Sequence, residues 1–161
     1  MTSGLRAQAD GLLGHWRLLS WTGRTDEGKG VRHGGERPQG DLLYLPSGRM
    51  SVQICHSGRA RFGSRDLAAG DEGLQASAYR TYIAYAGTYS LPEPGVVVHH
   101  VEIALHPDQV GMDKRRSYEL DGATLTLRTQ PVAAAGSMAS SILRWGIRER
   151  LDAGSPFPGS P

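Results

Sequence analysis

Two histidines and a glutamate within four residues are the chemically richest group in this sequence. His99, His100 and Glu102 belong to a valine-rich stretch that runs from residue 95 to 105. A neutral imidazole in a partly apolar pocket can both donate and accept a proton near neutral pH, which makes His99 the first candidate for acid or base chemistry. The alternative is a core histidine satisfied by a backbone carbonyl, and spacing alone weighs the two equally.

The stretch that carries these groups is predicted to be a strand, because it is rich in β-branched residues and has prolines on both sides. Alternation sends Val97, His99 and Val101 to one face and His100 and Glu102 to the other. Each face then carries apolar side chains and one imidazole, as expected for the wall of a partly polar cavity. A one-residue shift or a β-bulge would exchange the faces, so all three polar residues remain candidate catalytic groups.

Seven further strands are predicted from alternating or β-branched runs that are separated by turn residues. The Asp121-Gly122 pair is the strongest two-residue hairpin signal in the chain, because a type I′ turn needs positive φ at both central positions. The predicted strands cover residues 12–22, 40–45, 49–55, 83–91, 114–120, 123–129 and 138–149.

Eight strands joined mostly by hairpins can close into a barrel and leave no free edge. The sequence therefore predicts an all-β fold, a closed antiparallel barrel of about eight strands. One short helix over 74–82 is expected to cover an opening, with the long loop 23–40 at the rim. The barrel domain is expected over 12–150, between a flexible N-terminus at 1–11 and a disordered Pro/Gly/Ser-rich tail at 151–161.

Composition excludes several classes of function. The formal net charge of the 161 residues is +2 and the basic residues are scattered, which disfavours a nucleic-acid surface. Arg115 and Arg116 are expected on a solvated face. The single cysteine forms no internal disulfide, and no Cys/His spacing predicts a metal site. We find no Ser/His/Asp arrangement, phosphate loop or cofactor motif, so no cofactor is expected. Without a long apolar stretch, the chain is predicted to be cytoplasmic and to bind no membrane.

Several motifs resemble those of a known family. Gly14-His15-Trp16 resembles the G-x-W signature that opens the first strand of lipocalins and related barrels. It belongs to a set of motifs that occur in the order shown by bacterial and fungal lipocalin-like domain proteins, at residues 14–21, 40–53, 85–89, 99–102 and 110–111. The resemblance covers roughly residues 12 to 148.

The resemblance implies a closed antiparallel barrel with an internal cavity. Barrels related to this family range from passive carriers to cofactor-independent isomerases and cyclases of natural-product pathways, so the fold does not define an activity. In lipocalins the tryptophan of G-x-W closes one barrel end beneath an arginine of the last strand. Arg148 is the first candidate for that arginine here, and Arg144 and Arg150 are the alternatives.

An interior rich in aromatic rings with hydroxyls at their edges suits a flat or polycyclic ligand, either aromatic or polyketide-like. We expect a cofactor-independent isomerase or cyclase of secondary metabolism, with His99 as acid or base and Tyr85 orienting or polarising a carbonyl. A non-catalytic carrier is the alternative, and a barrel filled by its own side chains is a third reading. A homodimer is compatible with each of these three interpretations. Leu43 and Leu45 are predicted to face inward, and the expected ligand-binding residues are Trp16, Met50, Val52, Tyr89, Val101, Tyr118, Leu143 and Trp145.

Overall fold

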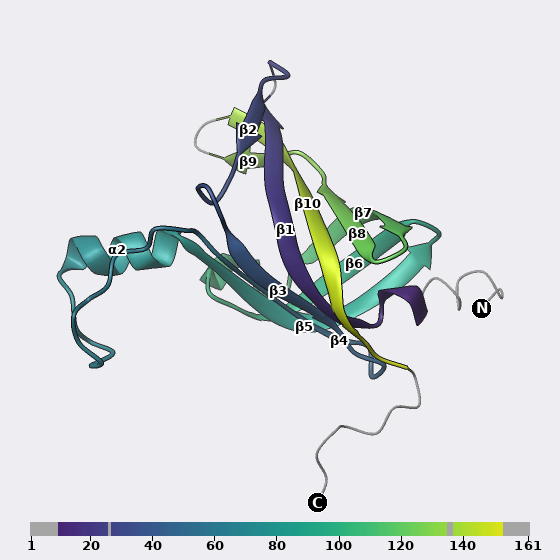
Figure 1. The fold of residues 1–161 in the computed structure, drawn as a ribbon, viewed down its shortest axis with the longest axis horizontal. Coiled ribbons are helices and arrows are strands. Elements are labelled where there is room, and N and C mark those ends of the chain that lie inside the picture. The colour runs from purple at the N-terminus through teal and green to yellow at the C-terminus, as the bar shows by residue number, and fades with distance from the viewer. Residues whose placement is uncertain (1–9, 26, 135–136, 153–161) are drawn as a thin grey trace, which may run out of the picture.

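Eight antiparallel strands close into a barrel in the computed structural model, which describes residues 10–25, 27–134 and 137–152 (Figure 1). Each strand pairs with the next in the circuit, and the last pairs with the first. The barrel strands are β1 (Gly14–Thr25), β3 (Gln39–Tyr44), β4 (Arg49–Cys55), β5 (Tyr82–Glu93), β6 (Val96–Ala104), β7 (Asp113–Asp121), β8 (Thr124–Thr129) and β10 (Ser137–Arg150). The predicted fold class is confirmed. Most of the expected flexible N-terminus and tail, residues 1–9 and 153–161, lies outside the described residues.

Two short strands extend the sheet beyond the barrel. β2 (Gly30–Arg32) pairs with the far end of β1, and β9 (Val132–Ala134) pairs with the start of β10. The expectation of a long loop over 23–40 is therefore wrong in part, because β1 continues to Thr25 and the chain folds back onto it as β2. Residues 23–40 show no regular spacing of apolar side chains because the strands they contain lie beyond the barrel core.

The predicted helix is present as α2 (Glu72–Arg80), which begins and ends two residues earlier than the predicted range 74–82. The carboxylate of Asp71 accepts a hydrogen bond from the backbone N–H of Leu74 at 2.8 Å and caps its start. It contains no buried residue. Figure 1 shows α2 and the loop before it projecting from one side of the barrel, so the expectation that this helix covers an opening is wrong. A short 3₁₀ helix, η1 (Pro107–Gln109), lies between β6 and β7. No helix in the described part of the chain is long and apolar enough to cross a membrane.

The hairpin at Asp121-Gly122 is present, but its turn lies one residue later than predicted. Asp121 pairs with Thr124, so Gly122 and Ala123 form the turn. Gly122 has a φ of +55°, a conformation that glycine adopts without steric cost.

On β3 the inward face is the opposite of the predicted one. Leu42 and Tyr44 are fully buried, whereas Leu43 and Leu45 are only partly buried. Both faces of this strand are apolar, so alternation alone does not identify the inner one. The register decides it: Tyr44 pairs with Met50 of β4, and directly opposed residues lie on the same face of a sheet.

One end of the barrel is closed by Trp16, which is fully buried and donates its indole N–H to the carbonyl of Leu12 at 2.8 Å. The guanidinium of Arg150 lies 5.0 Å from the centroid of the Trp16 ring. The first candidate for this arginine, Arg148, is therefore wrong, and Arg150, one of the two alternatives, is the arginine that lies over Trp16. Arg150 pairs with Gly14 at the start of β1, and a bulge between His15 and Trp16 shifts the register that spacing alone suggests.

Candidate functional site

A cavity of about 160 Å³ lies inside the barrel, away from the end that Trp16 closes. Its apolar wall comes from six strands and consists of Trp21, Leu42, Val52, Ile54, Ile83, Leu127, Leu143 and Trp145. Its polar groups are Tyr85, His99, Gln109, Lys114, Arg116, Thr129 and Ser141. The barrel is therefore not filled by its own side chains, and it combines an apolar wall with a few fixed polar groups, as small-molecule sites do.

His99 is the polar centre of this cavity. The residue is 1% exposed, and each ring nitrogen contacts a tyrosine hydroxyl. Its Nε2 lies 2.6 Å from the hydroxyl oxygen of Tyr44, and its Nδ1 lies 2.9 Å from that of Tyr85. The prediction that His99 faces inward is confirmed, and its partners are side chains of β3 and β5 rather than a backbone carbonyl.

Burial keeps this group of three neutral. Desolvation lowers the pKa of His99 to about 3, assisted by the positive charges of Arg116 and Lys114. Desolvation also raises the pKa of Tyr44 well above its ordinary value and raises that of Tyr85. A neutral imidazole has one N–H and one lone pair, so it donates to one tyrosine and accepts from the other.

The available hydrogen-bond partners favour one donor-to-acceptor direction through Tyr44, His99 and Tyr85. Tyr85 lines the cavity, whereas Tyr44 has His99 as its one hydrogen-bond partner in the described structure. If Tyr44 donates to Nε2, then Nδ1–H donates to the Tyr85 oxygen, and the Tyr44 hydroxyl proton and both nitrogens of His99 have partners. The Tyr85 hydroxyl proton is then available to an acceptor in the cavity. This arrangement can hold a ligand oxygen in a fixed position.

Lys114 and Arg116 bring two cations to the cavity from alternate positions of β7. The ammonium of Lys114 lies 4.2 Å from the centroid of the Tyr85 ring and donates to the side-chain oxygen of Gln109 at 2.7 Å. Burial and the neighbouring Arg116 lower the pKa of Lys114 to about 8. The expectation that Arg116 lies on a solvated face is wrong in part, because this residue is half-buried and lines the cavity. Arg115 does point outward, to Glu93.

The indole N–H of Trp145 is a further polar group of the site. Trp145 is fully buried and lines the cavity, and its Nε1 has no hydrogen-bond partner among the residues that the structure describes. A buried donor without a partner costs free energy unless a bound molecule or water accepts from it.

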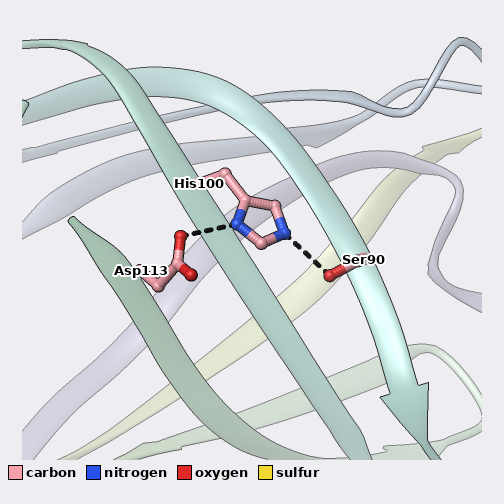
Figure 2. A network of polar contacts seen from close by, with 3 residues as sticks. All are labelled: Ser90, His100 and Asp113. Carbon is pink, nitrogen blue, oxygen red and sulfur yellow. Dashed lines mark hydrogen bonds and ion pairs between the residues drawn. The ribbon is translucent and has the colours of Figure 1, made fainter. Parts of the chain in front are cut away.

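The other two candidate catalytic residues of β6 lie outside the barrel. His100 contacts Asp113 through Nδ1 at 2.6 Å and Ser90 through Nε2 at 2.8 Å (Figure 2). Glu102 accepts a hydrogen bond from Arg49 at 2.6 Å. His100 and Glu102 therefore have separate partners, and the structure does not bring either to His99.

Ser90, His100 and Asp113 have the connectivity of a Ser/His/Asp group, which sequence reasoning missed because they come from three strands. Its surroundings differ from those of a hydrolase site. The Asp113 side chain is 68% exposed, and Ser90 lies within a strand rather than on a sharp turn beside backbone donors. We interpret this group as a polar cross-strand contact on the outer face of the barrel.

The expected ligand-binding residues separate into two sets. Val52, Leu143 and Trp145 line the cavity, together with Tyr85 and His99. The others pack in the barrel core without lining the cavity; Trp16, Met50, Val101 and Tyr118 are buried, and Tyr89 is half-buried with its ring 4.9 Å from that of Tyr44.

Sequence reasoning missed Tyr44, Lys114 and Arg116. Counting back by two from Tyr118, which is buried, places Arg116 and then Lys114 on the inner face, so alternation along β7 contained the signal. No group of three potential metal ligands occurs in the described ranges.

Comparison with known proteins agrees with this architecture. Residues 13–147 match the family model described as lipocalin-like domain. The chain is also similar to a curated protein of Aspergillus oryzae (strain ATCC 42149 / RIB 40), the 4'-hydroxy-3'-methoxypropiophenone carrier protein ppsC. The two are 28% identical over 110 residues, which span 63% of this chain and 99% of that protein. Because the family model matches most of the chain, this protein belongs to the lipocalin-like domain family.

Proposed function

We propose that this protein binds a small, single-ring aromatic molecule inside its barrel and carries it unchanged. The observation that carries the proposal is the cavity of about 160 Å³ with an aromatic and aliphatic wall. An apolar protein cavity of about 150 Å³ holds one benzene molecule. The size therefore favours one ring over the polycyclic ligands that the aromatic content of the sequence suggests.

The likeness to a fungal carrier supports this class of ligand. That relative is named for a molecule with one aromatic ring, a hydroxyl, a methoxy group and a ketone. In the present chain the Tyr85 hydroxyl and the Trp145 N–H are donors suited to a carbonyl or ether oxygen, and the apolar side chains suit the ring.

The protonation states favour carriage over proton-transfer catalysis. An efficient general acid or base has a pKa near the working pH, but burial lowers the pKa of His99 to about 3 and raises that of Tyr85 above its ordinary value. Both groups then keep their protons in place at neutral pH. The hydrogen bonds that His99 shares with Tyr44 and Tyr85, one donated and one accepted, also offset the desolvation cost of the imidazole, so its burial does not require a catalytic role.

Ligand size provides the first test. Fluorescence of Trp21 and Trp145 is expected to be quenched on titration with 4-hydroxyacetophenone, and much less with two-ring and three-ring analogues. Val52→Phe fills the cavity and should abolish the quenching. Ser51→Phe, one residue away with its side chain on the outer face, is the matched control and should preserve it. Equal binding of the three-ring analogue would contradict the proposed size.

An isomerase is the second candidate, because Tyr44, His99 and Tyr85 form a continuous hydrogen-bonded chain that ends at the cavity. Proton transfer at a carbon beside the ligand carbonyl would exchange that position with solvent deuterium. We expect no protein-dependent exchange when 4-hydroxyacetophenone is incubated with the protein in D₂O and followed by NMR. Exchange that His99→Gln abolishes would favour the isomerase over the carrier.

A further inference from the structure

Lys114 and Arg116 introduce two positive charges into the barrel interior without a negative charge to balance them. Both line the cavity, and no aspartate or glutamate of the described chain lines it with them. Their neighbours along β7 show the contrast, because Asp113 pairs with His100 and Arg115 pairs with Glu93 on the outer face. The inner positions of the same strand are left without counter-charges.

The contacts that these two cations make are with neutral groups. Lys114 donates to the side-chain oxygen of Gln109 at 2.7 Å and lies over the Tyr85 ring. Arg116 donates to the carbonyl of Arg115 at 3.2 Å. Neither cation takes part in an ion pair within the ranges that the structure describes.

Like charges in a poorly solvated site are costly unless an opposite charge joins them. The lowered pKa of Lys114, which results from burial and from the charge of Arg116, is the expected sign of that cost. A bound anion would relieve it, and a guanidinium beside an ammonium provides several donors for the two oxygens of a carboxylate.

The two cations also lie at a defined end of the site. Arg116 pairs with Thr129 of β8, and the hydroxyl of Thr129 accepts a hydrogen bond from the backbone N–H of Ser141. Arg116, Thr129 and Ser141 line the cavity at the end away from Trp16. Leu143 and Trp145 follow Ser141 by two and four residues along β10 and lie nearer the closed end. A ligand with one charged end and one apolar end therefore has a single favourable orientation.

We propose that the molecule bound in the barrel is a single-ring aromatic carboxylate, with its carboxylate between Lys114 and Arg116 and its ring against the apolar wall. This inference rests on the proposed binding function and specifies the chemical class of the ligand. The hydroxyl of Tyr85, held in place by His99, then contacts a second, neutral oxygen of the same molecule.

Calorimetric titration with benzoate and with benzamide tests the charge directly, because the two have nearly the same shape and differ in charge at pH 7. Charge-assisted hydrogen bonds predict that benzoate binds at least about tenfold more tightly. Arg116→Met should remove this preference, and Lys114→Met should reduce it. Arg115→Met, on the outer face of the same strand, is the matched control and should preserve it.

The outcomes separate the two proposals. Equal or tighter binding of benzamide would overturn the carboxylate and leave the binding function standing, and binding of neither would overturn both. Circular dichroism checks that each variant is folded. If Arg116→Met does not fold, Arg116→Lys is used instead; it keeps the charge and should retain the preference for benzoate. The inference would be contradicted if Lys114→Met kept the full preference for benzoate while the control Arg115→Met lost it.

Discussion

The Nδ1 atom of His99 lies 2.9 Å from the hydroxyl oxygen of Tyr85, and this contact joins the buried centre of β6 to the cavity. Tyr44 holds the opposite nitrogen of the same ring at 2.6 Å. The imidazole is thereby fixed on both sides and stays neutral. Its role in the proposed mechanism is to orient Tyr85 toward a ligand rather than to exchange protons with it.

Burial of His99 predicts a specific loss of stability in acid. Its pKa is about 3 in the native state and 6.5 in the unfolded chain, so between these values the unfolded state binds a proton that the native state does not. The free energy of unfolding then falls as the pH drops from 6.5 toward 3, by up to about 1.4 kcal/mol per pH unit. Urea titrations of His99→Gln should show a flatter profile over this range. Parallel profiles for the two proteins would show that His99 already titrates normally in the native state.

Removal of the Tyr44 hydroxyl should destabilise the fold more than removal of a surface hydroxyl. Tyr44→Phe leaves Nε2 of the buried His99 without its partner, which is expected to cost about 1–3 kcal/mol of unfolding free energy. Tyr82→Phe is the matched control, since the Tyr82 hydroxyl donates to Gln53 on the exposed surface and its loss should cost less than about 0.5 kcal/mol. Similar values for both variants would contradict the buried hydrogen-bond pair.

The barrel end closed by Trp16 depends on Arg150. Its guanidinium lies over the indole and donates to the carbonyls of Gly11 and Gly122, so Arg150→Ala should lower the free energy of unfolding by about 1–2 kcal/mol. Arg148→Ala removes an exposed arginine of the same strand and should change it by less than about 0.5 kcal/mol. A larger effect at Arg148 would place the closing arginine elsewhere.

Binding of benzoate should weaken as the pH rises past 8. The pKa of Lys114 is about 8 in the free protein, so above this pH the ammonium loses its charge, although a bound anion shifts the transition upward. His99 is already neutral between pH 7 and 9, and burial raises the pKa of Tyr85 above its ordinary value, so neither of these cavity groups titrates in that range. Lys114→Met should therefore give a pH-independent affinity over that range, and a persistent decrease in this variant would assign the titration to another group.

The sequence predicts the barrel well because its strands are separated by clear turn residues and because most strands have one plainly apolar face. On β6 the prediction that Val97, His99 and Val101 face inward is confirmed, although both faces of that strand carry apolar side chains and one imidazole. On β3 the prediction is wrong, because Leu42 and Leu43 are equally apolar and only pairing with β4 distinguishes them.

The site is harder to predict than the fold because its polar groups come from distant strands. Tyr44 meets His99 across 55 positions of sequence, and no local pattern indicates that contact. Charged residues at inner positions of β7 contradict the general rule that arginine and lysine face solvent. Arg116 is half-buried and lines the cavity, a position that becomes apparent only once the register of β7 is known.

NMR with methyl-labelled protein and 4-hydroxyacetophenone tests the central claim most directly. We predict nuclear Overhauser contacts from the ligand ring to the methyl groups of Leu127 and Leu143, which line the cavity. A separate groove on the outer face of the barrel carries Ile103 and Leu105, and their methyl groups should show no contact. Contacts to Ile103 and Leu105 without contacts to Leu127 and Leu143 would contradict binding inside the barrel.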